Sequence, residues 1–135
     1  MTIHLLIVDD SEQIRTSLRA LLGSVAGIAS IREASTLSEA LASVQAGPPT
    51  LVILDMSLPD GLGMDIIKPL KQLAPALLIA VFTIHADPIY SERCMALGAD
   101  WFFDKATETD ALLEVVSQHA VPKPFIHPSE GTLYA

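Results

Sequence analysis

Short apolar runs alternate along this chain with segments whose apolar residues recur at helical spacing. The runs are continuously apolar, with no polar residue at every second position, which is typical of strands buried on both faces of a sheet. The intervening spacing favours helices that lay one apolar side against that sheet. Strands are predicted at 3–8, 28–34, 51–55, 77–83 and 101–103, and helices at 11–22, 36–46, within 61–74, 88–97 and 107–119.

Five strands alternating with five helices predict an α/β fold, with a parallel sheet and helices on each side. The segment 28–34 is more polar than the other strands, so we expect it near an edge. Pro69 lies inside the third helical pattern, where it removes an internal hydrogen bond, so a late helix start or a kink is expected there. That helix should turn four residues inward, Ile66, Ile67, Leu70 and Leu73.

Three prolines close together separate the last segment from the rest of the chain. Pro122, Pro124 and Pro128 rule out a regular helix there. The pattern therefore predicts one domain over residues 1–120, followed by an extended tail over residues 121–135.

Composition narrows the classes of function. Sixteen acidic and eight basic residues give a net charge of −8, which argues against direct nucleic-acid binding. No apolar stretch approaches the roughly 20 residues of a membrane span, and there is no signal-peptide layout. A single cysteine, Cys94, allows no internal disulfide and is expected to be a small apolar residue. We expect a cytoplasmic protein that meets other proteins or holds a divalent cation.

Carboxylates follow two of the predicted strands at the points where these end. Asp9 and Asp10 come after residues 3–8, and Asp55 ends the run that begins at Leu51. Parallel strands would bring the three acids to one edge of the sheet, where ligands bind in doubly wound folds. Burying unpaired charge costs several kcal/mol, roughly, so a cation is needed. Carboxylate oxygens suit Mg2+.

Two more polar residues follow strands at the same edge, Thr83 and Lys105. A carboxylate can act as a nucleophile toward phosphorus, and phosphoryl transfer needs mainly position and charge compensation. Mg2+ and Lys105 would supply positive charge, and Thr83 would donate a hydrogen bond to a phosphoryl oxygen. The residues alone thus favour phosphoryl transfer to Asp55.

Four motifs in order resemble those of the response-regulator receiver domain, the CheY-like superfamily. They are Asp9-Asp10, LDMSLPDG at 54–61, Thr83, and GADWFFDK at 98–105. The resemblance covers about residues 3–120. It implies a flavodoxin-like doubly wound sheet of five parallel strands in the order 2-1-3-4-5, with five helices.

The resemblance also implies a role for each site residue. Asp55 is the expected phosphoacceptor, and Lys105 is expected to pair with it and then with the phosphoryl group. The expected Mg2+ ligands are Asp10, Asp55 and the backbone carbonyl of Ser57, with Asp9 acting through water. Thr83 and Phe102 form the expected switch, in which the hydroxyl moves to the phosphate and the ring swings inward.

Several plainer interpretations stay open beside these. Asp9-Asp10 alone is more often a helix N-cap and its neighbour, and Asp60-Gly61 is typical of a turn. Phe102 could be ordinary core. Ile14 could be core or, because phosphodonor proteins dock near it in the family, an exposed anchor.

Three residues beside the site depart from the family pattern. Ala106 stands where many receivers have proline, which puts a cis 105–106 bond in doubt. Ile84 stands where a small residue is usual, so slow loading by small phosphodonors such as acetyl phosphate is expected. His85 could influence hydrolysis of the phosphoryl group.

The expected function is a two-component response regulator that accepts phosphate from a histidine kinase or histidine phosphotransfer protein. It would signal to a downstream protein through the face formed by the fourth helix, fifth strand and fifth helix, with a homodimer possible. It would not be a substrate-turnover enzyme.

Two alternatives are a receiver fragment of a DNA-binding transcription regulator, against which the proline-rich tail argues mildly, and a phosphorylation-independent interaction module. A small Mg2+-dependent phosphatase is disfavoured, since no insertion is long enough for a cap.

Overall fold

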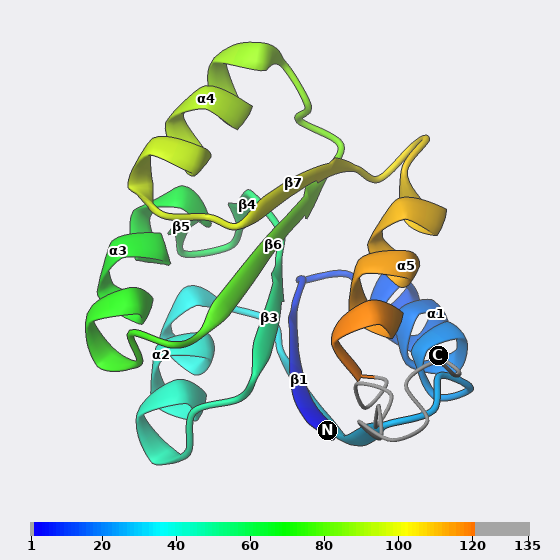
Figure 1. The fold of residues 1–135 in the computed structure, drawn as a ribbon. Helices are drawn as coiled ribbons and strands as arrows, with labels where there is room; N and C mark the ends of the chain where they lie inside the picture. Colours follow the sequence, from blue (N-terminus) through cyan, green and yellow to red (C-terminus); the bar gives the residue numbers. More distant parts are fainter. Residues whose placement is uncertain (1, 121–135) are drawn as a thin grey trace, which may run out of the picture.

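A five-stranded parallel sheet forms the centre of the computed structural model, which describes residues 2–120 (Figure 1). The strand order is β2-β1-β3-β6-β7, and every neighbouring pair is parallel. This confirms the expected order, because β6 and β7 are the fourth and fifth strands of the sheet. The bounds are β1 Ile3–Val8, β2 Ile28–Ala34, β3 Leu51–Leu54, β6 Leu78–Thr83 and β7 Trp101–Asp104.

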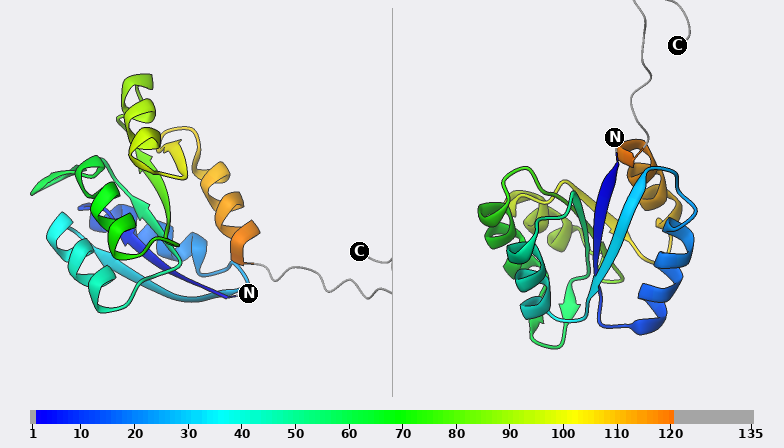
Figure 2. Two further views of the ribbon diagram at one scale, coloured as in Figure 1. Left: turned by 60° about the vertical axis from the view of Figure 1, so that its left-hand side comes forward. Right: turned by 90° about the horizontal axis from the view of Figure 1, so that it is seen from below.

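Five helices cover the two faces of the sheet. Helices α1 and α5 lie on one face, and α2, α3 and α4 lie on the other (Figures 1 and 2). This two-sided cover explains why the central strands are apolar without alternation. The bounds are α1 Glu12–Leu22, α2 Leu37–Ala46, α3 Met64–Leu73, α4 Pro88–Leu97 and α5 Thr109–Ala120.

Alternate residues of each strand pack into one of two cores. Leu6 and Val8 of β1 contribute to the core beneath α2, α3 and α4. Leu5 and Ile7 face the other way and pack with α1 and α5. Packing on both faces holds the sheet rigid, so the backbone just beyond the strand ends keeps a fixed position.

A small hairpin after β3 was not predicted from the sequence. Strands β4 (Ser57–Leu58) and β5 (Gly61–Leu62) pair antiparallel around a turn at residues 59–60. The turn predicted at Asp60-Gly61 is therefore confirmed, and Asp60 also has a second role, at the start of α2. The Asp60 carboxylate accepts hydrogen bonds from the backbone N–H groups of Leu37 (2.8 Å) and Ser38 (3.1 Å), at the start of α2. Such N–H groups have no partner within their own helix.

Several details differ from the sequence-based expectation. Helix α3 already begins at Met64 and continues through Pro69, so a late start is wrong, and the alternative of a kink at Pro69 stays a prediction. Leu73 is 44% exposed, so its inward placement is wrong as well, because it lies in the last turn of α3 beyond the edge of the core. Helix α5 begins at Thr109, two residues later than predicted, because the carbonyl of Asp104 accepts hydrogen bonds in a turn that precedes it. The predicted tail, residues 121–135, lies outside the described residues.

Two further observations concern the described residues only. All peptide bonds between residues 2 and 120 are trans, including the bond between Lys105 and Ala106. Among the helices described, none combines the length and the apolar character needed to cross a lipid bilayer.

Candidate functional site

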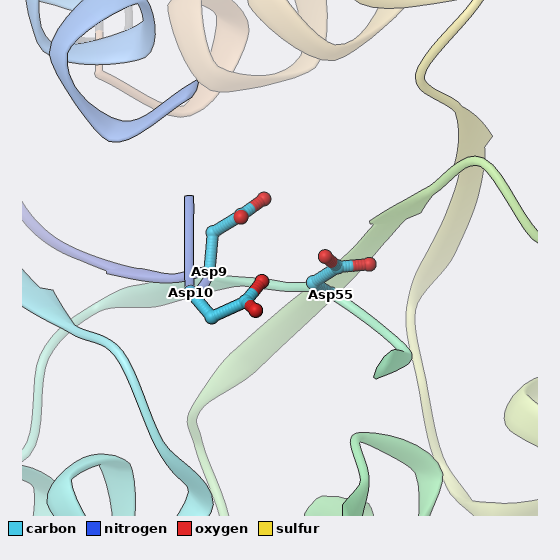
Figure 3. A group of neighbouring side chains, drawn as sticks. All are labelled: Asp9, Asp10 and Asp55. Carbon is cyan, nitrogen blue, oxygen red and sulfur yellow. The ribbon is translucent and has the colours of Figure 1, made fainter. Parts of the chain in front are cut away.

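Three carboxylates meet beyond the carboxyl ends of β1 and β3, as the sequence predicted. One oxygen from each of Asp9, Asp10 and Asp55 lies within 4.8 Å of the other two (Figure 3). Asp9 is 2% exposed and Asp55 is 6% exposed, whereas Asp10 is exposed to solvent. The site therefore places two buried acids and one accessible acid around a common point.

Lys105 supplies positive charge to the two buried acids from the loop after β7. Its ammonium lies 2.6 Å from Asp9 Oδ2 and 2.9 Å from Asp55 Oδ2. Burial of the ammonium works to lower its pKa, but the hydrogen bonds that it donates to Asp9 and Asp55 outweigh burial and raise the pKa of Lys105 above its ordinary value. Lys105 is therefore held protonated at the centre of the acidic group.

Burial and hydrogen bonding act on the Asp9 carboxyl in opposite directions. Burial raises the pKa of its carboxyl, although hydrogen bonds from Lys105 and from the Ser11 N–H act in the opposite direction. The Ser11 N–H donates to Asp9 Oδ1 at 2.9 Å, and Ser11 is itself the N-cap of α1, accepting from the Ile14 N–H. The interpretation of Asp9-Asp10 as the N-cap of α1 is thus wrong, because the N-cap is Ser11. Asp9 precedes the helix and accepts a hydrogen bond from the N–H of that N-cap residue.

Asp55 is fixed by its own backbone neighbours. Its N–H donates to the Val8 carbonyl (3.0 Å), and the Met56 N–H donates to its Oδ1 (2.7 Å). Gly63 packs so closely that a Cβ atom there would lie 2.0 Å from the Asp55 carbonyl oxygen. Only glycine fits at this approach, so the start of α3 limits where the Asp55 backbone can lie.

A cavity of about 250 Å³ opens at this group of acids. It is lined by Asp9, Asp10, Ser11, Asp55, Ser57, Ile84, His85 and Lys105. Five residues predicted for phosphorylation and metal binding are therefore brought together. Two of the three departures from the family pattern, Ile84 (68% exposed) and His85, also line this cavity.

The two predicted switch residues do not line that cavity. Thr83 is fully buried, and its hydroxyl oxygen accepts a hydrogen bond from the His85 N–H at 3.1 Å. Phe102 is partly buried and packs against the core beneath α3 and α4. Since Val81 is the register partner of Phe102 and lies two residues before Thr83, Phe102 and Thr83 point to the same face of the sheet. The structure gives Phe102 a core contact and leaves its switch role a prediction.

The cysteine does not take part in this site. Cys94 is fully buried on α4, and burial raises the pKa of its thiol to about 11. Its nearest polarisable partner is the Met56 sulfur at 3.5 Å. Both observations fit the expected role as a small apolar residue.

Sequence reasoning missed a group of charged residues behind the site. Arg15 on α1 donates from Nη1 to the Asp9 carbonyl (2.7 Å) and from Nε to Glu33 of β2 (2.8 Å). The four-residue spacing of Arg15 and Arg19 on α1 was a visible signal. Their common partner Glu33 could be found only once the position of β2 beside β1 was known.

The comparisons with known proteins identify the family. The family model described as the response regulator receiver domain matches residues 5–117. The chain belongs to the response regulator receiver family. A transcriptional activator protein from Pseudomonas putida, ExaE, is 35% identical over 112 residues, which cover 83% of this chain and 52% of that protein. The response regulator UvrY of Escherichia coli O157:H7 is 30% identical over 115 residues, covering 85% of this chain and 51% of that protein. The chain spans about half the length of the curated relatives it matches first.

Solved receiver structures share the fold. A CheY-like receiver domain protein from Methanospirillum hungatei JF-1 superposes with a TM-score of 0.80 at 27% identity, covering 89% of this chain and 94% of that one. A response regulator from Burkholderia pseudomallei, solved with a phosphorylated aspartic acid, a calcium ion and citrate, gives a TM-score of 0.75 at 26% identity, covering 92% and 76%. The receiver fold inferred from the sequence is confirmed, and this domain is the receiving component of two-component signalling.

The acidic group also fits a divalent cation. Three carboxylates with oxygens within 4.8 Å form an all-oxygen donor set, which hard cations such as Mg2+ and Ca2+ prefer. Lys105 neutralises only part of their charge, and exposed Asp10 is free of that ammonium, so an ion could approach from the solvent side. Asp10 and Asp55, with Asp9 beside them, could hold such a cation.

Proposed function

We propose that this receiver domain accepts a phosphoryl group on Asp55 from the phosphorylated histidine of a kinase or phosphotransfer protein, in a reaction that requires Mg2+. The observation that carries the proposal is the position of Asp55, which shares the Lys105 ammonium with Asp9, lies close to both Asp9 and Asp10, and lines a cavity of about 250 Å³. The phosphorylated aspartic acid and calcium ion of the Burkholderia pseudomallei relative support this assignment.

The transfer itself makes few demands on the side chains. An Asp55 carboxylate oxygen attacks phosphorus, the bond from phosphorus to the histidine nitrogen breaks, and the electron pair stays on the leaving imidazole. Mg2+, when bound, supplies positive charge to the phosphoryl oxygens. Lys105, freed from Asp55, pairs with the transferred group, and the Met56 N–H keeps Asp55 oriented. The domain assists its own loading and hydrolysis and does not turn over a separate substrate.

The signal leaves through Thr83 and Phe102. To reach the phosphoryl group, the Thr83 hydroxyl gives up the hydrogen bond that it accepts from the His85 N–H. The space that it leaves lies on the face of the sheet that also carries Phe102, so the ring can move inward. This is a bistable element biased by a local change of charge. The altered surface would be the one formed by α4, β7 and α5.

The partners follow from that surface and from the charge of the chain. A net charge of −8 suits recognition by a protein and disfavours direct contact with nucleic acid. We propose a downstream protein target or a second copy of the domain at the α4–β7–α5 face. We also propose that the domain works in the cytoplasm.

A second candidate is favoured by the relatives. ExaE is named a transcriptional activator, and the chain matches only about half of it. The receiver would then control a DNA-binding segment of a longer protein, and Asp55 would keep the same role. The intact mass of the native protein distinguishes this candidate from a receiver that signals to a separate protein.

The test uses beryllofluoride with Mg2+, which mimics the phosphoryl group on an aspartate. The wild-type protein should bind it and change its amide spectrum around Thr83 and Phe102, whereas Asp55→Asn should not respond. Asp110→Asn, which makes the same chemical change on α5, is the matched control and should behave as wild type. If wild type and Asp55→Asn give the same spectra with beryllofluoride, the phosphorylation proposal fails.

A further inference from the structure

A charged group behind the acidic site links α1, β1 and β2. The guanidinium of Arg15 donates to the Asp9 carbonyl at 2.7 Å and to Glu33 Oε1 at 2.8 Å. The Arg15 side chain is 16% exposed and that of Glu33 is 29% exposed, so the contact is partly shielded from water. A planar guanidinium held at two of its nitrogens has little freedom left.

The carbonyl that Arg15 reaches lies at the end of the β-ladder. The Val8 carbonyl still accepts from the N–H of Asp55, just after β3, and the Asp9 N–H donates to the carbonyl of Ala34, the last residue of β2. The Asp9 carbonyl lies beyond these bonds, where the chain leaves the sheet and turns toward α1. A carbonyl in such a place needs a donor, and Arg15 provides one from the helix that follows.

That peptide group joins the two acids of the site. The Asp9 carbonyl belongs to the peptide bond between Asp9 and Asp10, so its orientation sets where both side chains begin. On one side Asp9 contacts Lys105 and Ser11, and on the other Asp10 faces solvent. Fixing this one peptide therefore fixes two of the three carboxylates relative to Asp55.

We propose that Arg15, held in place by Glu33, is a positioning residue for the cation site, acting through the Asp9–Asp10 peptide. This inference rests on the proposed Mg2+ site. Arg15 does not touch the ion, and its charge opposes a cation. Its benefit is geometric, because groups outside the ligand shell that orient the ligands commonly affect metal affinity by about tenfold or more.

Helix α1 offers a matched control. Arg19 also donates to Glu33 (2.7 Å), but its second contact is the Ile31 carbonyl, away from Asp9. Arg15→Gln and Arg19→Gln each remove one positive charge and one bond to Glu33. Only the first removes the bond to Asp9.

The experiment measures Mn2+ affinity of the full chain by paramagnetic resonance of the free ion, with Mn2+ as an oxygen-seeking probe for Mg2+. Arg15→Gln should weaken Mn2+ binding about tenfold, as removal of an orienting group does, whereas Arg19→Gln should stay close to wild type. A purely electrostatic role predicts the opposite sign, since loss of a cation nearby strengthens binding of another. Arg15→Gln that binds Mn2+ as tightly as Arg19→Gln overturns the proposal.

Two additions keep the test decisive. Arg15→Lys retains the charge but has no fork with which to reach both partners, so it should also weaken binding, and it serves if Arg15→Gln does not fold. Hydrogen exchange of the Ser11 amide, which donates to Asp9 Oδ1, is read without metal. It should be faster in Arg15→Gln than in Arg19→Gln. If wild type binds no Mn2+, the proposed Mg2+ site fails, and the exchange comparison still decides the role of Arg15.

Discussion

The Lys105 ammonium lies closer to Asp9 than to Asp55, at 2.6 Å against 2.9 Å. The positive charge of Lys105 is therefore shared between the proposed phosphoacceptor and a neighbouring acid. Because Asp9 carries a second hydrogen bond from the Ser11 N–H, it can keep its place when Lys105 turns to a phosphoryl group on Asp55. The Lys105 ammonium would therefore need to move little to leave the Asp55 carboxylate and contact a phosphoryl group on the same residue.

Replacing Lys105 by methionine should destabilise the metal-free domain. Asp9 and Asp55 would remain buried without their cation, and breaking such pairs from one side costs about 3–5 kcal/mol in the free energy of unfolding. Added Mg2+ should restore part of this loss, because a divalent ion replaces the missing charge. Urea unfolding with chelator and with Mg2+ measures both effects.

Lys71→Met is the control for that comparison. Lys71 pairs with Asp100 at 2.8 Å, away from the acidic site. Its loss should lower stability by an amount that Mg2+ does not restore. Equal responses of the two variants to Mg2+ would show that Lys105 does not neutralise a cation site.

Ile84→Ala should speed loading by acetyl phosphate. The Ile84 side chain lines the cavity and is 68% exposed at its rim. Relieving a steric obstacle worth about 1 kcal/mol would raise the rate about fivefold. A protein phosphodonor should gain less, since it contacts a wider surface. Ile89→Ala, at another exposed isoleucine (60% exposed) on α4, should leave the rate unchanged. An unchanged rate in Ile84→Ala would count against obstruction by this side chain.

The main fold and the acidic site were predictable because their signals are local. Continuous apolar runs indicated buried strands, and the acids that follow them had to meet at one edge once the sheet was parallel. The β4–β5 hairpin is too short to show a pattern, and the capping of α2 by Asp60 joins residues 23 positions apart. The Arg15–Glu33 contact likewise depends on how α1 lies over β2. Contacts of this kind follow from packing and leave no periodic trace in the sequence.

Glu33→Gln should remove part of the acid sensitivity of the fold. Hydrogen bonds from Arg19 and Arg15 lower the pKa of Glu33 below its ordinary value of 4.5. A lowered folded-state pKa contributes stability above pH 4.5 that is lost as pH falls through the folded-state pKa. Wild type should therefore be more stable than Glu33→Gln at pH 7, and the difference should shrink below pH 4.5. Thermal unfolding across this range measures it, and a difference that is constant with pH would contradict the assignment.

Gly63→Ala should disturb the site although glycine is not required there by its backbone angles. The residue has φ −55° and ψ −35°, which alanine adopts readily. The obstacle is space, since the new methyl group would lie 2.0 Å from the Asp55 carbonyl oxygen and 3.2 Å from Met56 Cα. Overpacking against backbone costs about 1–3 kcal/mol, and relief would require Asp55 to move.

Gly47→Ala is the matched control, because nothing lies within 4 Å of its Cβ position and its extended backbone suits alanine. That variant should be neutral or stabilised by about 0.5 kcal/mol through the unfolded state. Urea unfolding together with the beryllofluoride response separates a loss of stability from a displaced Asp55, and Gly63→Ala that matches Gly47→Ala in both would show that the start of α3 does not position the phosphoacceptor.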